Sequence, residues 1–206
     1  MLGSNKMRLI NLKFWIIVLL LFVILGMLLW FARKTANDIP FDEYNIITDM
    51  FNENIAKVDS LNIERLVIVD STYSRYNLNN EEVNLIQSDY GFQIPKEIII
   101  DFQNKNKNEY KINRFFDFKI DYVLISENEL DHIFGDEPNW GKFYDVYPKS
   151  SGIIYFSRIG INQRKNEALL YYDIRSAGLS GAGYFIYLKK ENGKWKDAAL
   201  SRMWVS

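Results

Sequence analysis

The first strong pattern along the chain is an uninterrupted apolar run, FWIIVLLLFVILGMLLWFA, at residues 14–32. A helix of this length would span roughly 28 Å, close to the thickness of the hydrocarbon core of a bilayer. The run has no polar face, which a helix in a soluble core normally shows. It is also longer than the apolar region of a cleaved signal peptide, and no small-x-small cleavage site follows it. The pattern therefore predicts an uncleaved transmembrane anchor.

The basic residues around this run predict its orientation. Three of them precede the run and two follow it, namely Lys6, Arg8 and Lys13 before it and Arg33 and Lys34 after it. Positive charge close to a transmembrane helix favours the cytoplasmic side. We therefore expect residues 1–13 in the cytoplasm, the anchor in the cell membrane, and residues 33–206 as a single domain outside the cytoplasm.

Between residues 41 and 148, helical patterns alternate with short strand patterns and polar turns. The segment 41–57 places Phe41, Tyr44, Ile47 and Phe51 at helical spacing. Ser126 and Glu129 have the spacing of a capping box, which predicts the start of a helix over 127–134. Further helices are expected within 79–91, 94–106 and 139–148, and strands within 63–73 and 118–125.

The C-terminal part shows four strand patterns, at 152–161, 167–176, 182–191 and 194–205. Asn192-Gly193 lies between the last two, and this dipeptide accepts the positive φ angles of a tight type I′ hairpin turn. We therefore predict a C-terminal antiparallel β-meander against which the helices pack as one layer. C-terminal to its transmembrane helix, the chain is expected to have an α+β fold.

Three glycines fall close together in RSAGLSGAGYF, at Gly178, Gly181 and Gly183. A loop that binds phosphate needs a helix directly after its glycines, so that backbone N–H groups and the helix dipole face the anion. Here the alternating aromatic stretch GYFIYLK follows, and no G-K-[ST] ending occurs. The glycines are therefore expected to shape a wide hairpin or a bulge between two strands.

The stretches FSRIGIN, EALLYYDI and GYFIYLKKENGKWK resemble the C-terminal part of an uncharacterised group of bacterial proteins that are often membrane-anchored or secreted. The resemblance covers about the last 55 residues of the chain. It implies a β-meander and a place in the cell envelope, and it implies no activity. Members of the group often carry cysteines in the glycine loop, where this chain has Ala177 and Ser180, so no redox or bridging role is carried over.

Composition excludes several kinds of partner and site. Residues 35–206 carry 20 basic and 26 acidic residues, a net charge of −6, which disfavours nucleic acid because phosphates need a basic face. The absence of cysteine removes disulfides and thiolate metal sites. His132 is the single histidine and has no partner at metal-ligand spacing, so neither a metal nor another cofactor is expected. Ser157 and Ser201 lack a G-x-S-x-G context, so no catalytic residue is assigned.

Charged residues within the predicted strands form the candidate functional site. Strand alternation places Tyr171, Asp173 and Arg175 on one face, and Arg158 and Arg202 also fall inside strand patterns. In most sheets such charges are solvated or paired across strands. Alternatively, two or three of these arginines gather with Asp173 in a pocket that binds an anion, since the planar guanidinium suits carboxylate and phosphate.

These observations lead to one leading function and two alternatives. We expect a single-pass, signal-anchored bacterial protein that contacts the lipid bilayer, binds a protein partner in the cell envelope and catalyses no reaction. The first alternative is a hydrolase that uses Asp173, Arg158 and Arg202 in a cavity of the sheet. The second is a sensor that binds a small anion in the same cavity. A filled sheet interior with an exposed aromatic patch would favour the partner-binding function.

Overall fold

The computed structural model describes residues 18–27, 37–58, 63–74, 78–90, 93–136, 139–177 and 180–206. The chain divides into two compact units, Met1–Asp38 and Ile39–Ser206. In the first unit residues 18–27 are helical, whereas residues 1–13 and both ends of the expected anchor, 14–17 and 28–32, lie outside the described residues. Within the part of the chain that is described, no helix has both the length and the apolar character needed to cross a membrane. The anchor stays a prediction from the sequence.

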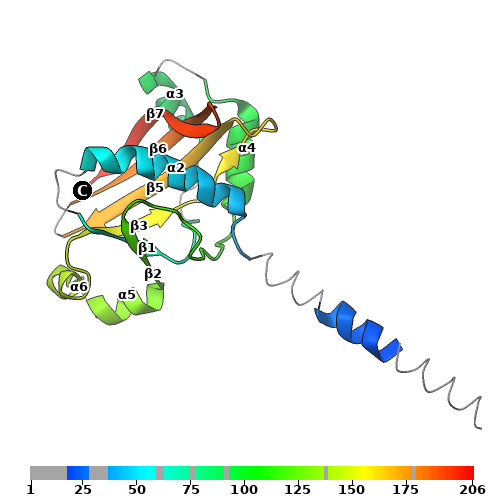
Figure 1. Ribbon diagram of the computed structural model, residues 1–206. Coiled ribbons are helices and arrows are strands. Elements are labelled where there is room, and N and C mark those ends of the chain that lie inside the picture. Colours follow the sequence, from blue (N-terminus) through cyan, green and yellow to red (C-terminus); the bar gives the residue numbers. More distant parts are fainter. Residues whose placement is uncertain are drawn as a thin grey trace, which may run out of the picture. The chain divides into compact units, whose positions relative to one another are not determined.

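The second unit is an α+β fold built around one mixed sheet (Figure 1). Its strands within the described residues are β1 (Arg65–Val69), β2 (Asp121–Ile125), β3 (Ser150–Phe156), β4 (Gly160–Ile161), β5 (Glu167–Ser176), β6 (Ser180–Glu191) and β7 (Lys194–Val205). Their order is β2-β1-β3-β5-β6-β7, and β4 pairs with β5. The expected antiparallel meander is confirmed for β5, β6 and β7. However, β1 runs parallel to both β2 and β3, so the sheet as a whole is mixed.

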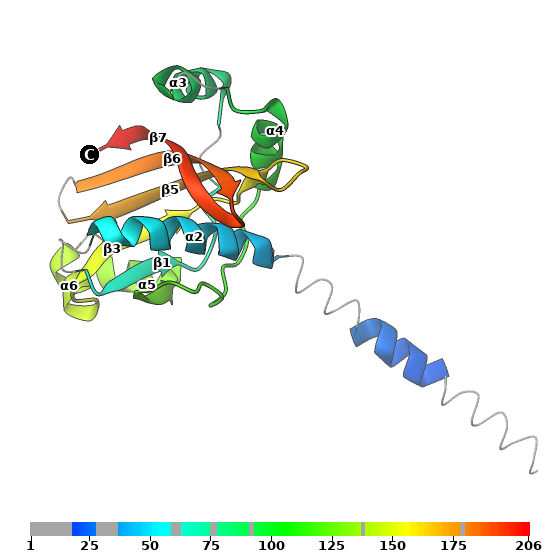
Figure 2. The same ribbon diagram turned by 45° about the horizontal axis from the view of Figure 1, so that its top comes forward.

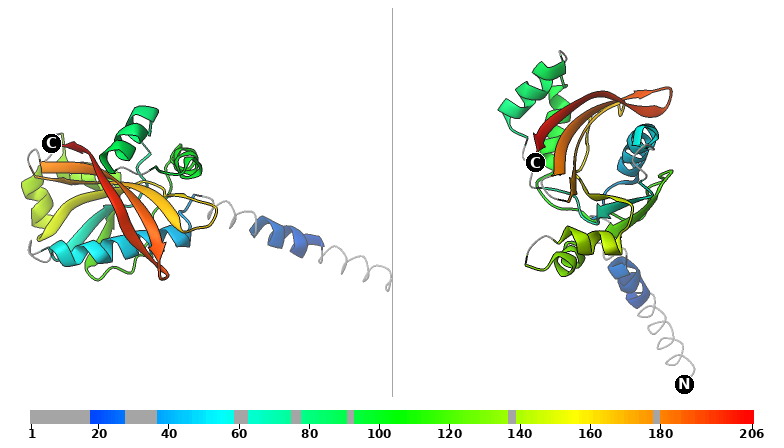
Figure 3. Two further views of the ribbon diagram at one scale, coloured as in Figure 1. Left: turned by 90° about the horizontal axis from the view of Figure 1, so that it is seen from above. Right: turned by 90° about the vertical axis from the view of Figure 1, so that its left-hand side faces the viewer.

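The helices lie on both faces of this sheet. They are α2 (Phe41–Val58), α3 (Asn80–Tyr90), α4 (Lys96–Lys105), α5 (Glu127–Phe134) and α6 (Trp140–Val146). The sheet curves around α2 (Figure 3). The outer face carries α3 and α4 over the antiparallel part and α5 and α6 over the parallel part (Figure 2).

The expectation of a single helical layer was therefore wrong, and β5 shows why. Ala168 and Leu170 pack in the apolar cluster beneath α2, whereas Leu169 and Tyr171 pack with α3 and α4. All four side chains are buried. Because the strand is apolar on both faces, each face needs its own covering layer.

The predicted strand 152–161 is divided in the structure. β4 begins only at Gly160, so residues 157–159 belong to no strand. Helix α4 passes so close that a Cβ added at Gly160 would lie 2.6 Å from the Cβ of Phe102. The side chain of Asn106, just after α4, accepts from the backbone N–H of Arg158 and donates to its carbonyl oxygen, over 2.7 and 3.0 Å. These contacts replace the hydrogen bonds of a continuous strand.

Several local sequence signals are confirmed. Ser126 and Glu129 form the expected capping box at the start of α5. Asn192 and Gly193 have φ angles of 50° and 83°, as a type I′ turn requires. The glycines lie at the hairpin between β5 and β6, as expected, but these two strands pair in continuous register up to Ser176 and Ser180, so no bulge forms between them. The register shifts instead between β6 and β7, directly after Gly183. Of these glycines, Gly178 lies outside the described residues.

Candidate functional site

Asp173 and Arg175 of β5 lie on the outer face of the sheet, as strand alternation predicted. On this face one apolar cluster contains Tyr171 and the residues under α3 and α4, and a second contains Tyr155 and the residues under α5 and α6. Tyr73 packs against both clusters. The ion pair and the residues around it, called the Arg175 site below, are Tyr73, Tyr155, Tyr171, Asp173, Arg175 and Trp204. Met203 packs against the same apolar cluster as Tyr171.

The centre of the Arg175 site is a short ion pair within one strand. Nε of Arg175 donates to one carboxylate oxygen of Asp173 over 3.0 Å, and Nη2 donates to the other over 3.2 Å. Asp173 is fully buried, whereas the side chain of Arg175 is 37% exposed. The buried carboxylate of Asp173 therefore holds the guanidinium of Arg175 in position while part of that guanidinium stays exposed to solvent.

Two tyrosine rings support this guanidinium. Cζ of Arg175 lies 4.2 Å from the ring centroid of Tyr155 and 5.5 Å from that of Tyr73. Cation–π contacts of this kind add to the hold of the carboxylate. Within the described residues, Arg175 donates once through Nε and once through Nη2, so the two N–H groups of Nη1 and the second N–H of Nη2 remain for a ligand.

Trp204 of β7 also contacts the site, through the hydroxyl of Tyr171. Its indole N–H donates to the hydroxyl of Tyr171 over 2.7 Å, and that hydroxyl lies 3.4 Å from the carboxylate of Asp173 as its donor. The indole lies across Gly183, where an added Cβ would be 2.6 Å from Cε2 of Trp204. At this position the glycine motif makes room for an indole ring.

Burial and pairing act in opposite directions on the charges of the site. Burial raises the pKa of the Asp173 carboxyl above its ordinary value, although the hydrogen bonds and charge of Arg175 lower it in part. Burial also acts to lower the pKa of Arg175, but the hydrogen bond and charge of Asp173 outweigh it, so the pKa of Arg175 is raised. The site therefore presents a permanent cation at a fixed position.

Arg158 belongs to a different ion pair. Its Nε and Nη2 donate to the carboxylate of Glu43 over 2.8 to 3.1 Å. The two side chains are only 7% and 2% exposed. The guanidinium of Arg158 also lies 4.4 Å from the ring centroid of Tyr110. This pair attaches α2 to the segment 157–159, and it leaves Arg158 bound to Glu43 instead of Asp173.

Arg202 lies in β7 and is exposed. Its cross-strand partner is Tyr184, which in turn pairs with Tyr172. Tyr172 packs against the apolar cluster beneath α2. Because cross-strand partners share a face, Arg202 lies on the face opposite to Asp173.

The alternative of a pocket that joins Asp173 with Arg158 and Arg202 is therefore not formed, and of the four candidate residues only Asp173 and Arg175 meet. The pattern of a single strand had placed these two residues on one face, but their ion pair was not predicted. Tyr73 and Trp204 were missed because they come from distant segments. The sequence signal for the position of Trp204 is Gly183, because the indole occupies the space that a side chain at residue 183 would fill.

The remaining candidates from the sequence have local contacts. His132 is exposed, and its carbonyl oxygen accepts from the ammonium group of Lys142 over 3.1 Å. Oγ of Ser157 donates to the carbonyl oxygen of Arg158 and accepts from the backbone N–H of Tyr171. Ser201 is buried. Among the residues that the structure describes, no group of His, Cys, Asp and Glu side chains could hold a metal ion.

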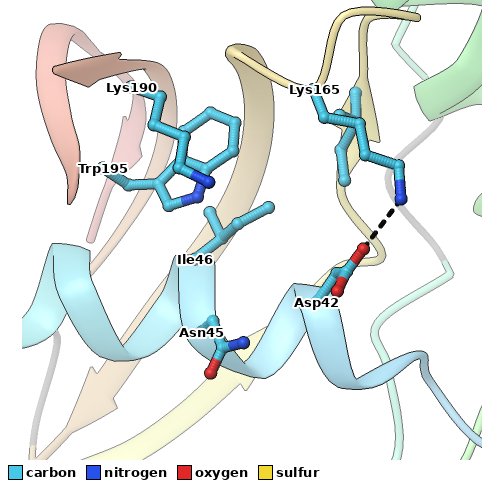
Figure 4. Close-up of a pocket in the computed structure, with 7 residues that line it drawn as sticks. Asp42, Asn45, Ile46, Lys165, Lys190 and Trp195 are labelled. Carbon is cyan, nitrogen blue, oxygen red and sulfur yellow. Dashed lines mark hydrogen bonds and ion pairs between the residues drawn. The ribbon is translucent and has the colours of Figure 1, made fainter. Parts of the chain in front are cut away.

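A small cavity of about 110 Å³ lies between α2, β4 and the β6–β7 hairpin (Figure 4). It is lined by Asp42, Asn45, Ile46, Ile161, Lys165, Lys190 and Trp195. The ammonium of Lys165 donates to Asp42 over 2.9 Å, and that of Lys190 lies 5.7 Å from the ring centroid of Trp195. Pockets for small organic ligands usually measure about 300–1,000 Å³. The cavity therefore suits a few ordered waters better than a ligand.

A comparison of the chain with protein-family models, with curated proteins and with solved structures finds no match. The resemblance of the last residues to a group of bacterial envelope proteins therefore rests on the sequence motif alone. It follows that the function has to be inferred from the geometry of the Arg175 site and from the pattern of the N-terminus.

Proposed function

We propose that the protein is a single-pass bacterial membrane protein whose domain outside the cytoplasm binds an acidic group of a partner protein in the cell envelope through the Arg175 site. The observation that carries this proposal is the guanidinium of Arg175. It is 37% exposed, and a fully buried carboxylate and two tyrosine rings hold it in place. A cation fixed in this way loses little conformational entropy when a ligand binds, which favours binding.

The residues around Arg175 fit a protein partner better than a small substrate. Tyr73 and Trp204 are half-buried, so each contributes apolar surface to the site, and the half-buried Met203 packs against the same cluster as Tyr171. Arginine, tyrosine, tryptophan and methionine are enriched at the centres of protein interfaces. A carboxylate of the partner would accept hydrogen bonds from Nη1 of Arg175, while apolar groups beside it contact the rings.

The same geometry argues against the proposed hydrolase. The carboxylate of Asp173 is fully buried and already accepts from Nε and Nη2 of Arg175. A general base or nucleophile must come within hydrogen-bond reach of the substrate. The carboxylate of Asp173 would reach a substrate only if Arg175 moved away. Its burial and its two hydrogen bonds to Arg175 instead favour a structural role, in which it orients the guanidinium.

Site-specific photo-crosslinking tests the binding surface in the full chain. A photoreactive amino acid at position 203, expressed in the membrane of the bacterial host, is expected to give a discrete adduct. Arg175→Met should abolish this adduct, whereas Arg202→Met, which alters an exposed arginine on the opposite face, should leave it unchanged. An adduct that survives Arg175→Met would contradict the proposal.

Acetate and sulfate distinguish the small-anion sensor from the partner-binding protein. If a free anion is the ligand, either salt at constant ionic strength should raise the melting temperature of the wild type but not of Arg175→Met. No such difference is expected, because a free anion lacks the apolar groups that would contact the rings beside Arg175. The location is tested separately: the chain should stay in the membrane pellet after alkaline carbonate extraction, and alkaline phosphatase fused after Ser206 should be active.

A further inference from the structure

Two phenylalanine rings form an exposed aromatic pair at one end of the domain. Phe41 begins α2 and is 62% exposed, and Phe115, in the segment before β2, is 57% exposed. Their ring centroids lie 6.2 Å apart in an edge-on arrangement. Exposed large apolar side chains that touch one another, unlike scattered ones, indicate a contact surface.

The buried ring of Tyr44 holds this pair in place. Its centroid lies 5.4 Å from that of Phe115 and 6.5 Å from that of Phe41. The hydroxyl of Tyr44, which is 1% exposed, accepts from the backbone N–H of Asn113 over 2.6 Å. The backbone N–H of Phe115 donates to the carbonyl oxygen of Asn113 over 2.9 Å, which closes a tight turn. The rings are therefore exposed on a rigid support.

The position of Phe41 in the sequence points to the bilayer as the surface that these rings contact. Only residues 33–40 separate Phe41 from the end of the apolar run. Eight residues reach at most about 28 Å even when fully extended, so a membrane anchor would keep Phe41 close to the lipid. Arg114 directly precedes Phe115, and its side chain is 66% exposed. Its Nη2 lies 3.8 Å from the carboxylate of Asp121, which is itself 50% exposed, and so weak a surface pair leaves the guanidinium able to bind lipid phosphate.

We propose that Phe41 and Phe115 insert into the interfacial region of the outer leaflet and that Arg114 binds a phosphate group there. This inference rests on the anchor in the proposed function. Aromatic and basic side chains together are typical of surfaces that lie in the bilayer interface. The contact would orient the domain on the membrane and restrict the directions from which a partner reaches the Arg175 site.

The absence of cysteine from the chain permits a direct test with single cysteine labels. The full-length variants Phe115→Cys and Val205→Cys are labelled with bimane and reconstituted into phosphatidylcholine vesicles that contain brominated lipid. Val205 is a matched control, because it is 66% exposed and lies at the C-terminal end, away from the start of α2 (Figure 1). We expect bromine to quench the label at position 115 at least threefold more than the label at position 205.

A second variant tests the contribution of Phe41. Phe41→Ser in the labelled Phe115→Cys protein should reduce the quenching, while Val146→Ser, at an apolar residue that is 49% exposed in α6, should not. Equal quenching at positions 115 and 205 in protein that resists carbonate extraction would overturn the membrane contact and leave the anchor intact. Release by carbonate would overturn the anchor and this inference with it. Quenching that depends on protein concentration would identify a second copy as the occupant and also overturn it.

Discussion

Replacement of Glu43 by alanine is expected to lower the free energy of unfolding by about 4 kcal/mol, because it leaves a charged guanidinium without a partner in the core. The carboxylate of Glu43 accepts from Nε and Nη2 of Arg158 and also from the backbone N–H of Ile159, over 3.1 Å. Removal of one partner from a buried pair costs about 3–5 kcal/mol. The side chain of Arg158 is only 7% exposed, so it cannot reach water unless α2 moves.

Asp42 provides a matched control because it precedes Glu43 in the same helix and also pairs with a basic residue. The ammonium of Lys165 lies 2.9 Å from its carboxylate, but the two side chains are 72% and 63% exposed. Such a pair contributes at most about 1 kcal/mol, so Asp42→Ala should have little effect. The double variant Glu43→Leu with Arg158→Met removes both buried charges and should recover at least about 2 kcal/mol of the loss.

The assay is urea unfolding of residues 37–206, which contain all the apolar clusters found in the described residues. Circular dichroism and tryptophan fluorescence follow the transition, and linear extrapolation gives the free energies. Equal losses for Glu43→Ala and Asp42→Ala would refute the reasoning. A double variant no more stable than Glu43→Ala would also refute it, because the cost would then not come from the stranded charge of Arg158.

Three further predictions test the strands. Gly183→Ala should cost about 2 kcal/mol and shift tryptophan emission, because its Cβ would lie within 2.6 Å of the Trp204 ring, whereas Gly141→Ala meets no atom closer than 3.5 Å and should be harmless. Gly193→Val should cost about 1 kcal/mol or more, since a β-branched residue resists a φ of 83°. Burial raises the pKa of Tyr172 above its ordinary value of 10.0. The folded state then keeps a proton that the unfolded chain releases, so stability should fall as the pH rises above 10, and less so in Tyr172→Phe.

Each of these predictions has an outcome that contradicts it. If Gly183→Ala and Gly141→Ala are equally stable, the Trp204 indole does not rest on β6. An unchanged melting temperature for Gly193→Val would exclude the positive φ angle at the turn. The same alkaline loss of stability in the wild type and in Tyr172→Phe would show that this hydroxyl is not protected by burial.

The elements that the sequence predicted correctly depend on neighbours along the chain. The capping box of Ser126 and Glu129 is closed by hydrogen bonds across three residues. The turn at Asn192-Gly193 depends on the φ angles that these two residues accept. Likewise, the shared face of Asp173 and Arg175 follows from the alternation of side chains in one strand. Short-range geometry was enough for each of these predictions.

The tertiary structure alone decided which distant groups meet. Arg158 was expected inside a strand, with a pocket shared with Asp173 as the alternative. The packing of α4 against Gly160 interrupts the strand, and the guanidinium binds Glu43, 115 residues away. The mixed sheet likewise depends on β1 lying between β2 and β3, which no local pattern encodes. An ionised side chain in the core must pair with an opposite charge from whichever segment packs beside it. Burying it unpaired costs more free energy than local conformational preferences can offset.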